Sequence, residues 1–267
     1  MRRASLALAT FTGLLAAAAP LPAQEWIAPS ETASGQDLLY RGRFSAAHLY
    51  FTRLAESRPR DPVGPTLAAS ALIWWGNARE DDRFLADSIE ALLAEGLARA
   101  TRAASEAPDD SSRAAAYFWV GTSYAYRARQ ADLQGKWWRA ARDAGHMHAA
   151  LERALVLDST CVDCLLGLAV YEYGLARASA IARLVARIIG LGGGDVDHAM
   201  ELFRRVAAEG TVTRTEARWV YASALAREGA RDAALREEAL RMVADLVDEY
   251  PENPVFRRFL DNPPTTP

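Results

Sequence analysis

The chain has 267 residues, of which 51% are hydrophobic, and its 31 basic and 34 acidic residues give a formal net charge of −3. This acidic balance argues against nucleic acid as a partner, because phosphate binding needs a basic face. A chain of this length and composition can bury a substantial core, either as one elongated domain or as two compact ones.

Residues 1–23 have the order of a secretory signal peptide. Arg2 and Arg3 precede an apolar stretch that ends at Ala19, and a second small residue, Ala23, follows. The apolar stretch is about 14 residues long, whereas a helix needs about 20 to cross a bilayer. We therefore predict general export, cleavage near Ala23 in preference to Ala19, and a periplasmic or extracellular protein with no integral membrane anchor. Cleavage would leave 29 basic residues against 34 acidic ones.

The remainder of the chain predicts an all-α protein. Alanine, leucine and arginine recur at three- and four-residue spacing, which is typical of helices. Short breaks rich in Gly, Pro or Asp end one helix and offer a cap for the next; they lie at 59–62, 108–111, 158–160, 192–195 and 251–254. We expect one helical domain over 24–260 and a Pro-rich tail over 261–267. Asp195 is predicted to cap a helix, and the acidic clusters 80–82 and 109–110 to lie at helix starts.

Two sets of residues carry an internal repeat. Ala47, Phe51 and Pro59 form an Ala-x3-Phe element followed by proline, and an aromatic-x2-Val-Gly-x2-Tyr element runs from Tyr117 to Tyr124. In both respects the chain resembles the tetratricopeptide repeat family. Weaker copies begin near residues 151, 165, 199, 219 and 239. The resemblance implies an α-solenoid of four or five helical hairpins, in a regular superhelix or in a compact and irregular form.

In this family the first helix of each hairpin lines a concave face, which implies a groove for a protein or peptide partner within an envelope complex. The groove residues implied by the resemblance are Phe118, Thr122, Tyr126, Leu166, Tyr173, Val220 and Arg227. The alternative for such aromatic residues is the core. Phe51 and Tyr124 are predicted to face an adjacent helix, whereas Tyr126, about 200° further round the helix than Tyr124, should face away from that contact.

A second function remains open. The run from Tyr117 to Tyr173 loosely resembles the helical T-component associated with periplasmic TRAP transporters, which implies a ligand-binding accessory of a transport system. A closed apolar pore between the hairpins would favour this function. An open groove with polar walls would favour the peptide-binding scaffold.

The two cysteines, Cys161 and Cys164, are predicted to lie at a helix start, where unpaired amides lower the pKa of a thiol. They form either a structural disulfide or a pair of part-buried thiols, and a thiol oxidoreductase is a third functional class. His146 and His148 are two residues apart and would point away from each other on a helix, so we predict no metal site. We also predict no cofactor and no catalytic residue, because the sequence lacks the usual phosphate-loop and hydrolase motifs.

Overall fold

The computed structural model describes residues 29–178 and 193–263. The expected signal peptide, Gly192 and the end of the Pro-rich tail lie outside these residues. The described residues form eleven helices and no strand. The helices are α1 (Pro29–Tyr40), α2 (Phe44–Ser57), α3 (Val63–Arg79), α4 (Ala86–Glu106), α5 (Asp110–Leu133), α6 (Trp137–Leu157), α7 (Cys164–Arg177), α9 (Val196–Glu209), α10 (Arg214–Glu228), α11 (Ala233–Glu249) and α12 (Pro254–Asp261). The all-α prediction is confirmed for this part of the chain.

Side-chain caps explain where several helices begin. The Asp109 carboxylate accepts a hydrogen bond from the Ser112 amide at the start of α5, and Asp195 does the same for the His198 amide of α9. These bonds satisfy amides that have no partner within their own helix. The predicted caps at Asp109 and Asp195 are therefore confirmed.

The prediction for the acidic cluster 80–82 is wrong. Glu80 ends α3 in the left-handed conformation, with φ of 55°, and α4 begins only at Ala86. The Asp81 carboxylate accepts a hydrogen bond from the Arg83 amide within the connecting turns. The cluster closes one helix instead of opening the next, because the chain reverses immediately after α3.

Small residues let successive helices pack closely. Ala47 is fully buried, and a Cβ atom built on Gly121 of α5 would lie 2.5 Å from Leu151 of α6. Phe51, which was predicted to be structural, is fully buried as well. The close approach of α5 and α6 thus depends on the absence of a side chain at Gly121.

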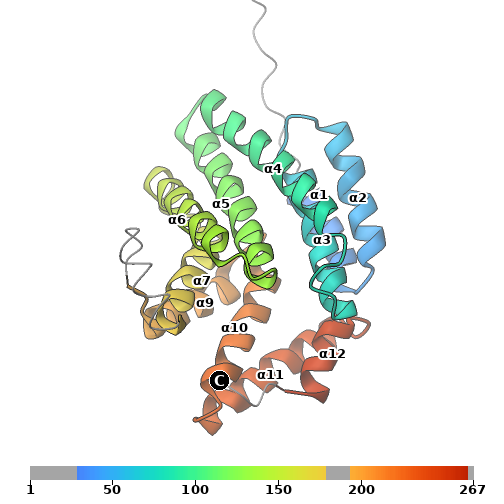
Figure 1. Ribbon diagram of the computed structural model, residues 1–267, viewed down its shortest axis with the longest axis vertical. Coiled ribbons are helices and arrows are strands. Elements are labelled where there is room, and N and C mark those ends of the chain that lie inside the picture. Colours follow the sequence, from blue (N-terminus) through green and yellow to red (C-terminus); the bar gives the residue numbers. More distant parts are fainter. Residues whose placement is uncertain (1–28, 179–192, 264–267) are drawn as a thin grey trace, which may run out of the picture.

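The C-terminal helix packs against the N-terminal part of the fold (Figure 1). Asn253, at the start of α12, donates a side-chain hydrogen bond of 2.8 Å to the Tyr40 carbonyl. The Arg258 guanidinium donates to the carbonyls of Asn77 and Ala78 at the end of α3, at 2.5 and 3.3 Å. Phe256 contacts the Trp74 ring edge-on, with centroids 5.7 Å apart. These contacts bring the last helix against α3, whose inner side faces a common space with those of α5, α7 and α10.

Within the described ranges, no helix is both long enough and apolar enough to cross a membrane.

Candidate functional site

Two adjoining cavities occupy the space between the inner helices. The inner cavity, of about 260 Å³, lies between α3, α5, α7 and α10, with Leu151 of α6 also in its wall. The outer cavity, of about 610 Å³, is lined by α5, α6, α7 and Arg227 of α10. Ala125, Arg129 and Val170 line both cavities. These shared residues mark the junction through which a ligand in the outer cavity would reach the inner one.

Two tryptophans dominate the apolar wall of the inner cavity. Trp74 of α3 and Trp219 of α10 have ring centroids 6.2 Å apart. Phe256 of α12 contacts both rings, with centroid distances of 5.7 and 5.4 Å. Trp74 is almost fully buried, so packing behind this wall fixes its orientation. The wall offers aromatic surface that a ligand can contact without rearranging the core.

A carboxylate from α10 faces the same cavity. Glu216 accepts a hydrogen bond of 2.7 Å from the Tyr126 hydroxyl, which in turn accepts one of 3.1 Å from Ser70. Burial raises the pKa of Glu216, and the Tyr126 hydrogen bond and the nearby positive charge of Arg129 oppose this shift. The same burial holds the Tyr126 pKa well above its usual value. The Tyr126 hydroxyl and the Arg129 charge therefore only partly offset the cost of burying the Glu216 carboxylate.

Arg129 lies at the junction of the two cavities. Its guanidinium donates a 2.7 Å hydrogen bond to the Asn77 side chain. Desolvation lowers the Arg129 pKa, and the negative charge of Glu216 opposes this effect. Among the described residues no carboxylate oxygen lies within 4.0 Å of the Arg129 nitrogens, so even Glu216 forms no ion pair with it. A half-buried cation without an anionic partner is available to a ligand.

Asp163 holds one end of the inner cavity together. Its carboxylate accepts hydrogen bonds from the amide and hydroxyl of Thr213, at 2.8 and 2.7 Å, and from the amide and hydroxyl of Thr211, at 3.0 and 2.5 Å. These bonds join the start of α7 to the start of α10. A disulfide between Cys161 and Cys164 encloses Asp163, with Cα atoms 5.4 Å apart. The disulfide thus lies beside the cavity wall and constrains the loop that carries Asp163.

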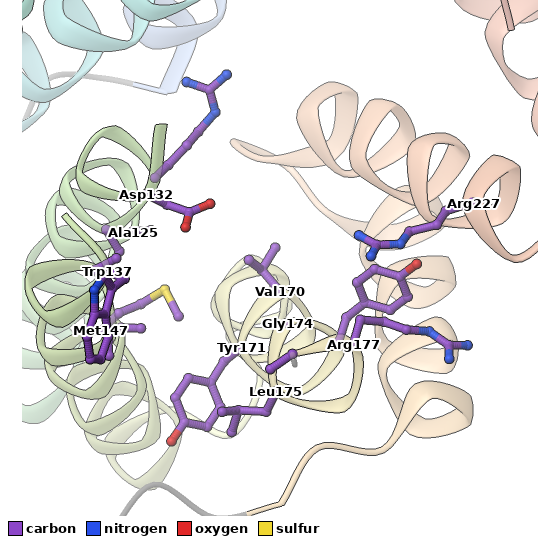
Figure 2. A pocket seen from close by; sticks show the side chains of 17 residues that line it. Ala125, Asp132, Trp137, Met147, Val170, Tyr171, Gly174, Leu175, Arg177 and Arg227 are labelled. Atoms are coloured by element: carbon purple, nitrogen blue, oxygen red, sulfur yellow. The ribbon is translucent and has the colours of Figure 1, made fainter. Parts of the chain in front are cut away.

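The outer cavity also carries charged side chains. Figure 2 shows Asp132 and Arg227 on opposite sides of this cavity, with Val170 between them. The Tyr173 hydroxyl donates a 2.8 Å hydrogen bond to Glu228, which also pairs with Arg177. Burial and the Glu228 carboxylate raise the Tyr173 pKa to about 12. Three arginines, Arg129, Arg177 and Arg227, thus line the outer cavity together with Asp132.

All seven groove residues implied by the repeat resemblance line one of the two cavities. Phe118, Thr122, Tyr126, Leu166 and Val220 line the inner cavity, and Tyr173 and Arg227 line the outer one. Their role in binding a partner stays a prediction.

Tyr126 faces away from the contact that Tyr124 makes, as predicted. The Tyr124 ring lies on His146 of α6, with centroids 5.0 Å apart. Tyr126 is nevertheless only 8% exposed, because its hydroxyl bonds to Ser70 of α3 and Glu216 of α10. These two contacts lie outside the isolated hairpin from which the prediction was made.

Sequence reasoning missed Glu216 and Arg129. Arg129 lies three residues after Tyr126, and Glu216 lies four residues before Val220, so both continue helical stripes already assigned to the groove. Extending each stripe by one turn would have found them.

In the two described ranges no group of three or more His, Cys, Asp or Glu side chains is arranged to hold a metal ion. Comparison of the chain with protein-family models, with curated proteins and with solved structures finds no significant match.

Proposed function

We propose that this chain is an exported binding protein that holds a small amphipathic molecule between tetratricopeptide-like helical hairpins. The observation that carries the proposal is the inner cavity, in which a largely apolar wall surrounds Glu216 and Arg129. Small-molecule sites have this character: a concave apolar surface with a few polar groups, and volumes of roughly 300–1,000 Å³. The inner cavity, at about 260 Å³, lies just below this range, and the outer cavity of about 610 Å³ adjoins it. The proposal assigns no catalytic residue.

The pairing of helices supports a repeat-like architecture. α1 contacts α2, α3 contacts α4, α5 contacts α6, α7 contacts α9, and α10 contacts α11. The Ala-x3-Phe element at Ala47 and Phe51 falls on α2, the second helix of the first pair. The inner helices α3, α5, α7 and α10 are first helices of their pairs, as a concave face of a compact solenoid would require.

The order of residues in segment 1–23 supports export to the periplasm or beyond. An exported protein with a concave ligand site suits an accessory of an envelope transport system, the function implied by the loose T-component resemblance.

A protein or peptide partner is the second candidate, and one observation favours it. Trp137 and Trp138, at the start of α6, are 51% and 54% exposed and stack with centroids 4.2 Å apart. Trp137 also lines the outer cavity. Exposed tryptophans are enriched at binding hot spots, so a peptide could lie across this rim and enter the outer cavity.

Filling the inner cavity tests the first proposal. Val220→Trp places a large ring in the cavity wall, whereas Val156→Trp makes the same change at a position that is 86% exposed on α6. Small molecules extracted from the native protein should raise the melting temperature of the parent and of Val156→Trp, but not of folded Val220→Trp. Equal stabilisation of both variants would contradict the proposal. If only a peptide is recovered and Trp137→Ala abolishes its binding, the second candidate holds instead.

A further inference from the structure

The inner cavity presents two opposite charges that lie close enough to influence each other but, among the described residues, form no ion pair. Glu216 projects from α10 and accepts a hydrogen bond from Tyr126, whereas Arg129 projects from α5 and donates to Asn77. Both line the cavity, and among the described residues no contact within 4.0 Å joins them. Two half-buried charges that face one small space without pairing suit a ligand that carries both complementary charges.

We propose that the inner cavity binds a small zwitterion of amino-acid size, with its ammonium group at Glu216 and its carboxylate at Arg129. This inference rests on the proposed small-molecule function and deepens it by naming the ligand class.

The surroundings of Glu216 suit an ammonium group. Among the residues that the structure describes, the carboxylate accepts one hydrogen bond, from Tyr126, although a carboxylate can accept about four. Trp74 and Trp219 line the same cavity. The face of a tryptophan ring attracts cations within about 6 Å, and the attraction grows when the cation is desolvated. An ammonium group at Glu216 would therefore gain an ion pair within a cavity that is partly lined by aromatic side chains.

The surroundings of Arg129 suit a carboxylate. A guanidinium carries five N–H donors in a planar fork that matches the two oxygens of a carboxylate. Asn77 accepts one of these donors. Asn77 also holds the guanidinium at the junction of the cavities. Less side-chain conformational entropy of Arg129 is therefore lost when a ligand binds.

The remaining wall sets the size and the polarity of the ligand. Ile73, Phe118 and Leu166 line the inner cavity and offer apolar contact to a side chain between the two charged groups. The volume of about 260 Å³ suits a molecule of amino-acid size. An apolar α-amino acid or a betaine meets these requirements, and the two differ in whether the ammonium group can donate hydrogen bonds to Glu216.

Titration calorimetry on the mature protein, first freed of bound ligand by unfolding and refolding, tests the proposal. The probes are leucine, phenylalanine and glycine betaine, together with two analogues of leucine that each lack one charged group, 4-methylpentanoate and 3-methylbutylamine. We expect at least one zwitterion to bind. Leucine, if it is that ligand, should bind about 30-fold or more tightly than either analogue, since removing one partner of a buried charge pair costs this much or more.

Two variants locate the charges. Glu216→Gln and Arg129→Gln keep much of the side-chain shape and should each weaken binding of the zwitterion by about 30-fold or more. Glu201→Gln, at an exposed position of α9, is the matched control and should bind like the parent. Far-UV circular dichroism would establish that each variant is folded. The leucine analogues test the same charges in the unmodified protein.

The outcomes separate this inference from the proposed function. If neutral apolar molecules bind and neither charge change weakens them, the zwitterion proposal is wrong and the small-molecule function stands. If the zwitterions fail and no extracted molecule binds the parent, both are wrong. Binding that survives in Glu216→Gln and in Arg129→Gln would also overturn the zwitterion proposal.

Discussion

The hydroxyl group of Tyr126 links three helices, and its removal gives a sharp test of the inner site. Tyr126→Phe keeps the buried ring but deletes the donor to Glu216 at 2.7 Å and the acceptor for Ser70 at 3.1 Å. A hydrogen bond to a charged group is worth about 1.5–3 kcal/mol, and a buried group left unsatisfied costs about 1–3 kcal/mol. A proton on Glu216 would relieve part of this cost. We therefore expect Tyr126→Phe to lower the free energy of unfolding by about 2–3 kcal/mol at neutral pH.

For a domain of this size, about 2–3 kcal/mol lowers the melting temperature by roughly 4–12 °C. Tyr173→Phe is the matched control, because its hydroxyl also donates to a glutamate, Glu228. Glu228 keeps its contacts with Arg177, so the control should lose about 1 kcal/mol or less. Urea unfolding followed by far-UV circular dichroism measures both losses.

A double-mutant cycle assigns the loss to the proposed bond. In a Glu216→Gln background the hydroxyl no longer serves a charge, so Tyr126→Phe should cost less than in the parent. The cost in the parent should also fall in acid, since the hydroxyl bond stabilises the ionised carboxylate. Equal losses for the two tyrosine variants, or additive losses in the cycle, would refute this account of the inner site.

Three further predictions follow from packing, cross-linking and charge. Gly121→Val should cost about 1–3 kcal/mol by overpacking, because its Cβ would lie 2.5 Å from Leu151; an unchanged thermal melt would contradict this. Replacing Cys161 and Cys164 together with serine should leave the helicity intact and cost about 2 kcal/mol or less, as the closed loop is short; a large loss of circular dichroism would show otherwise. Because burial raises the Glu216 pKa, the contribution of Glu216 to stability is fully present below its unfolded pKa and is lost as the pH rises through its folded pKa. Glu216→Gln should therefore gain stability relative to the parent protein over that pH range. A difference between the two melting temperatures that does not change with pH would disprove this prediction.

The helices were predictable because their limits are set locally. Asp109 and Asp195 cap helices through bonds to amides three residues away, and such spacing is visible in the sequence. The stripe that ends at Tyr126 was also predictable, since residues three and four apart share one face of a helix. The same spacing places Arg129 on this face, three residues after Tyr126. It was missed because the predicted set of groove residues on this helix ended at Tyr126.

The packing of α12 against the N-terminal helices could not be predicted from such local spacing. Asn253 bonds to Tyr40, 213 residues earlier in the chain, and no local pattern predicts so distant a pair. The burial of Tyr126 likewise depends on distant residues, Ser70 and Glu216. The repeat resemblance implied a groove along α5 and left undecided whether it is an open groove or a closed pore. In the structure α3, α7 and α10 face this side of α5 across the inner cavity.

The packing of α12 also bears on the proposed function. An open concave face exposes its side chains to solvent, so a charge such as Glu216 would be hydrated and would contribute little to binding. With α12 packed on α3 and Phe256 behind both tryptophans, the same carboxylate lies in a small space of low polarity. Electrostatic interactions are stronger there, and an unmet charge is more costly. By packing behind the two tryptophans, α12 supports the apolar wall that the proposed small-molecule site requires.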